Sequence, residues 1–165
     1  MLGRMSKARI SVNGFISSAE KNRELAGEFI DLLNERVTPL NEYDIDAWTY
    51  LRLEVGICWD EKIKEKCDDA AFGIFLLSPA FLGRRQCLEE LEFFLGSDRL
   101  AFPVGLAPVN LQLHDLRGLE KLQIHRLRND RGDDPRWFSQ LSEGERGELV
   151  DGLVTSMVKR FRAEL

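Results

Sequence analysis

A buried strand that leads into a serine, and then a glutamate on a helix, form the pattern in this sequence that could do chemistry. Residues 72–77 are a continuous apolar run, which is typical of a strand buried on both faces. The run ends at Ser78, and an amphipathic segment that begins at Cys87 then carries Glu90. In open α/β sheets, ligands bind in the crevice beyond the carboxyl ends of the strands. We therefore expect Ser78 and Glu90 to share one cleft.

Glu90 has two interpretations. It could act as a catalytic carboxylate, or it could be an ordinary charge on the helix surface, because Glu89 and Glu92 lie beside it. Successive residues of a helix are rotated by about 100°, so Glu89 and Glu90 cannot point the same way. The apolar pattern predicts that the buried side of this helix consists of Leu88, Leu91 and Leu95.

Bulk properties narrow the classes of function. The 165 residues predict one domain with a sizeable core, and the net charge of −5 argues against a broad nucleic-acid-binding surface. No apolar run is long enough to cross a bilayer, so we expect no membrane partner. The three cysteines show neither metal-ligand spacing nor a disulfide framework, which predicts no metal site and a reducing, cytoplasmic setting.

Strand-like and helix-like segments alternate along the chain. Strands are expected at 8–16, 43–48, 72–77, 100–106 and 122–127. Helices are expected at 18–36, at 57–67, from residue 87 onward, and at the end of the chain. This alternation predicts an α/β fold, a flavodoxin-like, five-stranded, mostly parallel sheet with helices on both faces. Pro103, near the middle of the fourth strand, places that strand toward the sheet edge or marks a bulge.

The last helix, over roughly 142–164, carries the clearest local pattern. Ser142 and Glu145 have the spacing of a capping box at its start. An apolar stripe follows, made of Leu149, Val150, Leu153, Val154, Met157, Val158 and Phe161. A stripe at this spacing predicts core packing rather than a ligand site.

Several common α/β functions lack their motifs. The sequence contains no GxGxxG after its first strand, no GxxxxGK[ST] and no GxSxG, so dinucleotide-binding, P-loop and α/β-hydrolase chemistry are unsupported. A phospho-acceptor receiver domain needs an aspartate where this chain has Ser78. His114 and His125 stand without the sequence partners of a triad or a metal site, which favours structural roles.

Five segments, in order, resemble motifs of the TIR (Toll/interleukin-1 receptor/resistance) domain family, in particular its NAD-cleaving bacterial or plant-like members. These segments are Phe15–Ser18, Leu53–Gly56 followed by Trp59, Ile74–Leu82, Cys87–Leu91 and Phe102–Val104. The resemblance covers roughly 8–127, and the last helix is similar to the fifth helix of the family. It implies that residues 1–165 form a single TIR domain.

The resemblance implies an activity and a set of site residues. Enzymatic members of the family cleave the bond between nicotinamide and ribose in NAD, which is a substrate rather than a cofactor. The glutamate before the leucine of the fourth segment corresponds to Glu90, the expected catalytic residue. The expected substrate-binding residues are Phe15, Ser17, Ser18, Trp48, Arg52, Gly56, Ser78 and Gln86.

Two positions depart from the pattern of active relatives. Gln86 stands where an aromatic residue often precedes the glutamate, and Thr49 stands where an acidic residue is common. Trp48 could provide a stacking surface for the substrate instead, or it could pack in the core. Cys87 at the helix start could carry a lowered pKa, but a small packed residue is the favoured interpretation.

Two functions therefore remain. The first is an NAD glycohydrolase or cyclase that acts as a TIR effector in cytoplasmic immune or stress signalling, including defence against phage. The second is a non-catalytic module that binds other TIR domains. By resemblance, residues 49–56 would mediate self-association in either case. The apolar side chains in 50–56 predict an exposed loop that packs on a partner or folds back on its own domain.

Overall fold

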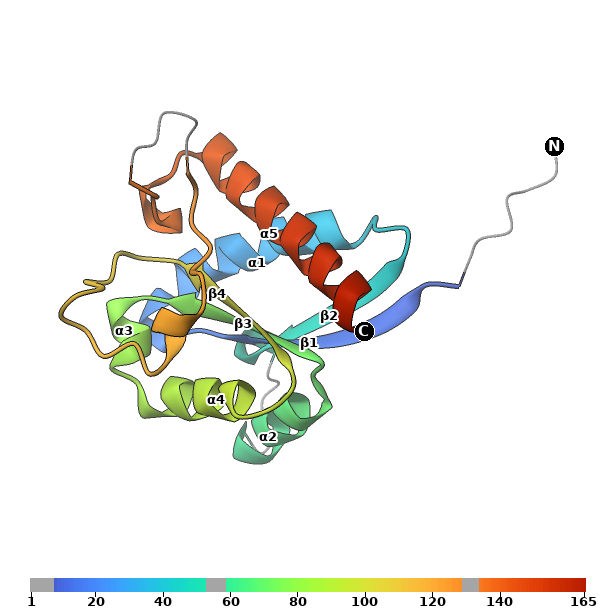
Figure 1. The fold of residues 1–165 in the computed structure, drawn as a ribbon, viewed down its shortest axis with the longest axis horizontal. Helices are drawn as coiled ribbons and strands as arrows, with labels where there is room; N and C mark the ends of the chain where they lie inside the picture. Colours follow the sequence, from blue (N-terminus) through green and yellow to red (C-terminus); the bar gives the residue numbers. More distant parts are fainter. Residues whose placement is uncertain (1–7, 53–58, 129–133) are drawn as a thin grey trace.

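A parallel β-sheet organises the computed structural model of the chain, which describes residues 8–52, 59–128 and 134–165. Its strands are β1 (Ile10–Ser17), β2 (Tyr43–Thr49), β3 (Phe72–Leu77) and β4 (Leu100–Gly105). They lie in the order β2-β1-β3-β4, and each neighbouring pair is parallel (Figure 1). From β1 the chain first adds β2 on one side of the sheet and then adds β3 and β4 on the other side. Ligands of open α/β proteins bind at such a point, beyond the carboxyl ends of the two strands that flank it, here β1 and β3.

The prediction of a fifth strand at 122–127 is wrong, because the described residues form a sheet of four strands. His125 makes one parallel bridge to Val104, with its N–H donating to the Pro103 carbonyl and its carbonyl accepting from Gly105 N–H. The preceding rung of such a ladder would need an N–H from Pro103, which proline lacks. The following rung is lost because Leu127 pairs with Arg136 instead.

Helices cover both faces of the sheet, as the sequence predicted. They are α1 (Arg23–Val37), α2 (Trp59–Asp69), α3 (Pro79–Leu82), α4 (Arg85–Leu95) and α5 (Glu143–Glu164). Short 3₁₀ turns lie at η1 (Glu20–Asn22), η2 (Tyr50–Arg52), η3 (Leu119–Lys121) and η4 (Phe138–Gln140). Helices α1 and α5 pack together on one face, and α2 and α4 lie on the other (Figure 1). No helix in the described ranges is both long and apolar enough to span a bilayer.

Strand β3 is the centre of the core. All six of its residues are buried, which confirms the interpretation of the continuous apolar run. Its side chains alternate between the two faces, as the period of a strand requires. Phe72, Ile74 and Leu76 join the cluster beneath α1 and α5, while Phe75 and Leu77 join the cluster beneath α2 and α4.

Helix α5 has the predicted cap and the predicted stripe. The Ser142 hydroxyl accepts from Glu145 N–H at 3.3 Å, and the Glu145 carboxylate accepts from Ser142 N–H at 3.0 Å. All residues of the stripe are buried except Val158, which is half-buried. His125 also holds this helix, because its Nε2 lies 2.8 Å from the Leu149 carbonyl oxygen.

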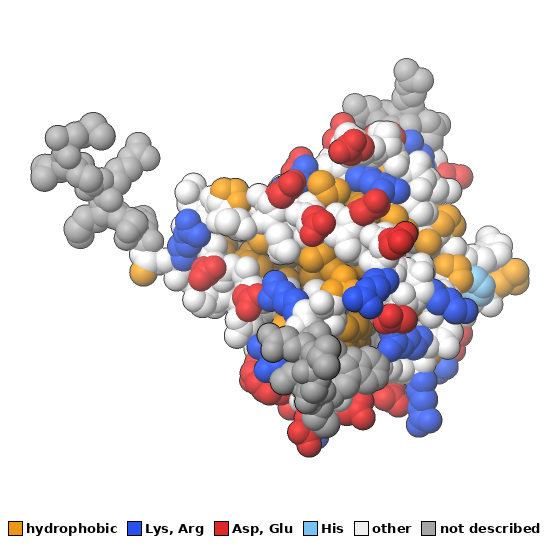
Figure 2. Space-filling view, turned by 180° about the vertical axis from the view of Figure 1, so that it is seen from behind, with side chains coloured by type: hydrophobic (Ala, Val, Ile, Leu, Met, Phe, Trp, Pro, Cys, Tyr) orange, Lys and Arg blue, Asp and Glu red, His pale blue; other side chains and the backbone are white. Residues whose placement is uncertain are grey.

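The surface carries charges of both signs. On the face shown in Figure 2, lysine and arginine side chains are interspersed with aspartate and glutamate, and hydrophobic side chains lie between them. Mixed charges of this kind produce no strong field of a single sign over that face.

Leu153→Ala and Met157→Ala should each lower the free energy of unfolding by about 2–5 kcal/mol, because truncation of a buried side chain leaves a cavity. Ser156→Ala, at an exposed position of the same helix, should change it by less than about 0.5 kcal/mol. Urea unfolding monitored by circular dichroism measures all three variants. Equal midpoints for Ser156→Ala and Met157→Ala would show that the stripe is not core.

Candidate functional site

Glu90 lies on the buried face of α4, with only 6% of its surface exposed. The other buried residues of this helix are Cys87, Leu91 and Phe94. The predicted buried side is therefore partly wrong, since Leu88 and Leu95 are only half-buried. Cys87, Leu91 and Phe94 are completely buried in the cluster between α4 and the sheet, and Glu90 lies on the same face of the helix.

Two hydroxyl groups hold one oxygen of the Glu90 carboxylate. The Ser17 hydroxyl donates to Oε2 at 2.6 Å, and the Tyr50 hydroxyl donates to the same oxygen. Ser17 is the last residue of β1 and Tyr50 directly follows β2, so the ends of two adjacent strands supply the donors. The other oxygen, Oε1, is buried and has no hydrogen-bond partner in 8–52, 59–128 or 134–165.

Burial raises the pKa of Glu90 from its ordinary value to about 7, because the charged form loses contact with water. The hydrogen bonds from Ser17 and Tyr50 oppose this rise, as do the positive charge of Arg84 and the Gln86 amide. Near neutral pH, protonated and ionised forms of the carboxyl group therefore coexist. This property distinguishes Glu90 from a glutamate on a hydrated helix surface.

Glu89 shows the contrast. Its side chain is exposed and forms a surface ion pair with Arg85 at 3.0 Å, one helical turn away. Pairs of this kind contribute little to stability. Glu89 thus fits the interpretation of an ordinary helix charge, which Glu90 does not, and it provides a matched control for experiments on Glu90.

An aromatic cluster positions the Tyr50 ring. Phe15 stacks on Trp48 with ring centroids 5.7 Å apart, and Tyr50 meets both rings edge-on, at 5.7 Å from Phe15 and 6.1 Å from Trp48. Arg84 lies over the Tyr50 ring at 6.0 Å. Phe15 and Trp48 are buried. Trp48 therefore packs in the core, which was one of its two predicted roles, and it orients a residue that contacts Glu90.

Glu90 lines a groove between α2 and α4 with a volume of about 590 Å³. This volume lies within the usual range for small-molecule sites. From α4 the groove is also lined by Gln86 and Phe93, and from α2 by Ile63, Lys64 and Cys67. The structure thus brings Gln86 and Glu90 to one wall of the same groove.

The serines at the strand ends differ in what they contact. Ser78 caps α3, since its hydroxyl accepts from Phe81 N–H at 2.9 Å and donates to Asn22 Oδ1 at 2.6 Å. Neither of these hydrogen bonds involves Glu90, and Ser78 is not among the described residues that line the Glu90 groove. Ser18 is buried, and its carbonyl oxygen lies 3.6 Å from the Cys87 sulfur. This contact ties the start of α4 to the end of β1.

Among the described residues, Arg52 and Thr49 form no hydrogen bond with Glu90. Arg52 forms an ion pair with Asp46 at 2.7 Å on the surface of β2. Gly56 lies outside the described residues. Thr49 is buried, and its hydroxyl has no hydrogen-bond partner within the described part of the chain.

The cysteines near Glu90 are packed thiols. Burial, together with the nearby charge of Glu90, raises the pKa of both Cys67 and Cys87 to about 12. The pKa of Cys87 is thus raised rather than lowered, which fits the packed position of its side chain in the core. Within the described ranges, no group of three or more His, Cys, Asp or Glu side chains could hold a metal ion.

Tyr50 is the site residue that sequence reasoning missed. The sequence places it among the apolar residues of the loop after β2, and no local pattern identifies its hydroxyl as a partner of Glu90. The available signal was its position directly after a strand that neighbours β1, since the ends of parallel strands meet at one edge of the sheet.

Comparisons with known proteins agree with this architecture. A family model for the TIR domain matches residues 15–142. Among solved structures, the chain is similar to the crystal structure of the TIR domain of the Toll-related receptor TRR-2 from Hydra magnipapillata. The two share 19% sequence identity with a TM-score of 0.53 over 67% of this chain and 80% of that one. Likeness at this identity shows the fold alone. A search of curated protein sequences found no significant match.

The buried carboxyl group predicts a pH dependence of stability. Between pH about 4.5 and about 7 the unfolded chain ionises Glu90 while the folded chain keeps it protonated, so stability falls as pH rises through this window. Glu90→Gln removes this contribution to the pH dependence of stability, because glutamine does not ionise. Wild type should therefore lose stability relative to Glu90→Gln as the pH rises. Between pH 5 and pH 8, the difference in unfolding free energy between the two proteins should shift in favour of Glu90→Gln by on the order of 3 kcal/mol. Denaturant unfolding at both pH values measures the difference, and Glu89→Gln should stay parallel to wild type. A constant difference for Glu90→Gln would contradict the burial argument.

Proposed function

Because the chain belongs to the TIR domain family, we propose that it cleaves the bond between nicotinamide and ribose in NAD, with Glu90 as the catalytic carboxylate. One observation carries the proposal. Glu90 is buried at the wall of a groove, with one oxygen held by two hydroxyls and the other oxygen without a partner among the described residues. This oxygen is buried in the chain without substrate, so a substrate that displaces the covering side chains would gain an acceptor for one of its hydroxyl groups.

The chemistry suits a single carboxylate. When the bond between ribose C1′ and the nicotinamide nitrogen breaks, its electron pair goes to the ring, and nicotinamide leaves as a neutral molecule. No acid is needed for this departure. Positive charge develops on the ribose, as in glycoside hydrolysis. An ionised Glu90 held against the ribose hydroxyls would stabilise that charge, more strongly in a site that excludes water.

Completion of the reaction needs a nucleophile at C1′. Addition of water with loss of a proton gives ADP-ribose, and attack by an atom of the same molecule gives a cyclic product. In both cases Ser17 and Tyr50 act as positioning residues, because both hydroxyls bind Oε2 and fix the orientation of the carboxylate. Phe15 and Trp48 contact the Tyr50 ring edge-on and hold it in position.

The proposed biological role is that of an immune or stress effector, including an effector against phage, that depletes NAD or produces an ADP-ribose signal. Cys67 and Cys87 are unpaired and buried, which suits the reducing cytoplasm where we place this activity. Ser18, Arg52, Gly56, Ser78 and Gln86 remain proposed contacts of the rest of the NAD molecule.

A non-catalytic module that binds other TIR domains is the second candidate. It is favoured by the two departures from the pattern of active relatives. Thr49, in place of the acidic residue, is buried, and Gln86, in place of the aromatic residue, offers an amide rather than a ring to the groove. In this case the Glu90 contacts would serve only to tie α4 to the ends of β1 and β2.

Self-association through residues 49–56 belongs to both candidates as a proposal. Of this segment, residues 53–56 lie outside the described part of the chain. Tyr50 contacts Glu90, and Leu51 packs partly against the main core. The first residues of the segment thus fold back on their own domain, so a partner bound to the segment could change the position of Tyr50 and thereby the position of Glu90.

Glu90→Gln should abolish NAD cleavage by the full chain, with a loss of about 10²–10³-fold, because the amide carries no charge to stabilise the ribose cation. Glu89→Gln should retain most activity. Release of nicotinamide over time, followed by chromatography at high protein concentration, measures both variants. Normal turnover by Glu90→Gln would refute its catalytic role. A wild-type chain that releases no nicotinamide under the same conditions would favour the non-catalytic module.

If self-association completes the site, nicotinamide release per mole of chain should rise with concentration over an about hundredfold range, because assembly follows mass action. Sedimentation velocity across the same range reports the assembly state. Constant specific activity, together with a monomer throughout, would show that each domain has a self-contained site.

A further inference from the structure

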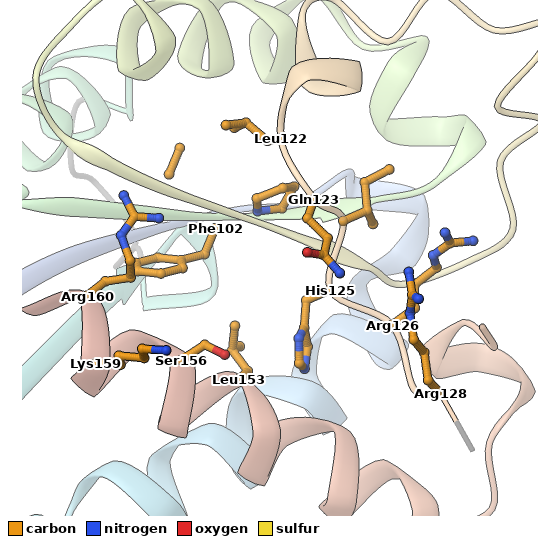
Figure 3. Close-up of a pocket in the computed structure, with 13 residues that line it drawn as sticks. Phe102, Leu122, Gln123, His125, Arg126, Arg128, Leu153, Ser156, Lys159 and Arg160 are labelled. Atoms are coloured by element: carbon orange, nitrogen blue, oxygen red, sulfur yellow. The ribbon is translucent and has the colours of Figure 1, made fainter. Parts of the chain in front are cut away.

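A second groove, of about 490 Å³, lies at the open edge of the sheet and is separate from the Glu90 groove. We call it the basic groove. It is lined by β4, by residues 122–128 and by α5 (Figure 3). The groove exists because 122–128 bridges β4 only at His125 and does not continue as a strand along its edge.

Positive side chains gather in this groove although the chain as a whole is acidic. Figure 3 shows Arg126 and Arg128 on one side and Lys159 and Arg160 on the other, with His125 between them. No aspartate or glutamate is among the lining residues. A hollow lined by charge of one sign concentrates its field and attracts ions of the opposite sign.

Nearby carboxylates offset only part of this charge. Arg160 pairs with Glu164 at 3.0 Å, and Asp134 acts on Arg126 from a greater distance. Arg128 and Lys159 form no ion pair within 8–52, 59–128 and 134–165. These two exposed cations are therefore available to a ligand.

Arg126 is held in place but incompletely paired. Its guanidinium lies over the Trp137 ring at 5.1 Å, and its Nε atom is buried without a hydrogen-bond partner in the described part of the chain. The positive charge of Arg128 acts on it unfavourably. Two arginines that repel each other are stabilised when an anion binds between or beside them, because the anion offsets both charges.

The remaining lining is suited to an apolar ring. The His125 ring lies in the middle of the groove with the Gln123 amide nearby, and the half-buried Leu122 and Ile124 add apolar surface to its lining (Figure 3). Arginine and lysine are the usual partners of phosphate. The combination therefore matches an anion attached to a ring that is largely apolar but can form hydrogen bonds. The volume of the groove is typical of small-molecule sites.

We propose that the basic groove binds a nucleoside diphosphate, with Arg126 and Arg128 contacting its phosphates and with Gln123 and His125 contacting its base. The site is independent of the proposed cleavage of NAD, because it shares no lining residue with the Glu90 groove.

Isothermal titration calorimetry of the full chain with ADP tests this site. The double variant Arg126→Gln/Arg128→Gln should raise the dissociation constant by at least about tenfold. Arg128→Gln alone, which keeps the contact between Arg126 and Trp137, should raise it by at least about threefold. The matched control Lys21→Gln/Arg23→Gln removes the same charge near α1 and should change it by less than about twofold. Glu90→Gln should bind ADP as wild type does, so failure of the proposed NAD cleavage would leave this result unaffected.

Several outcomes would overturn the proposal. ADP that does not bind, or an equal loss in the control variant, would exclude a site in the basic groove. Loss of ADP binding in Glu90→Gln would place the nucleotide in the other groove. Pyrophosphate that binds as tightly as ADP would exclude contacts to the base, and tighter binding of a single-stranded oligonucleotide would identify a nucleic acid rather than a nucleotide as the ligand.

Discussion

The removal of one carboxylate from water is the constraint on which the site depends. A buried charge is costly unless hydrogen bonds compensate it, and Glu90 receives two from hydroxyl groups. Ser17 and Tyr50 can supply them only because β1 and β2 are adjacent and parallel, so that both strands end at one edge. The order of the strands thus determines the chemistry of the site.

The two hydrogen bonds compensate only part of the cost of burying the Glu90 carboxylate. Burial has a larger effect on the pKa of Glu90 than its hydrogen bonds, so the carboxyl group titrates near neutral pH instead of remaining fully ionised. The buried oxygen without a protein partner adds to the cost. This arrangement suits the catalytic role proposed above, in which the carboxyl group contacts a developing positive charge.

The sequence predicted the elements better than their pairing. The apolar run of β3 and the stripe of α5 depend on the residues of one element, and both were confirmed. The strand expected at 122–127 depended on a neighbour, and Pro103 has no N–H to offer it. In the same way, the position of Glu90 on α4 and its contact with Tyr50 depend on packing between distant segments, which no local pattern encodes. The TIR resemblance identified Glu90, but not the hydroxyl groups that hold it.

The missing fifth strand has a consequence for the opposite end of the sheet. An edge strand without a continuous partner leaves space beside β4, and α5 and residues 122–128 line that space with cations. One proline thereby contributes both to the end of the sheet and to the shape of the basic groove. The two grooves are separate, so each can be altered by substitution without loss of the other.

The ionisation of Glu90 itself is the most direct measurement of the central claim. Nuclear magnetic resonance of the chain labelled with carbon-13 at glutamate side-chain carboxyls gives the pKa of each group, and the spectrum of Glu90→Gln assigns the resonance of Glu90. The account predicts a pKa of about 7 for Glu90, with a further rise in Tyr50→Phe because one stabilising hydrogen bond is lost. A pKa near the ordinary value of 4.5, unchanged in Tyr50→Phe, would contradict it.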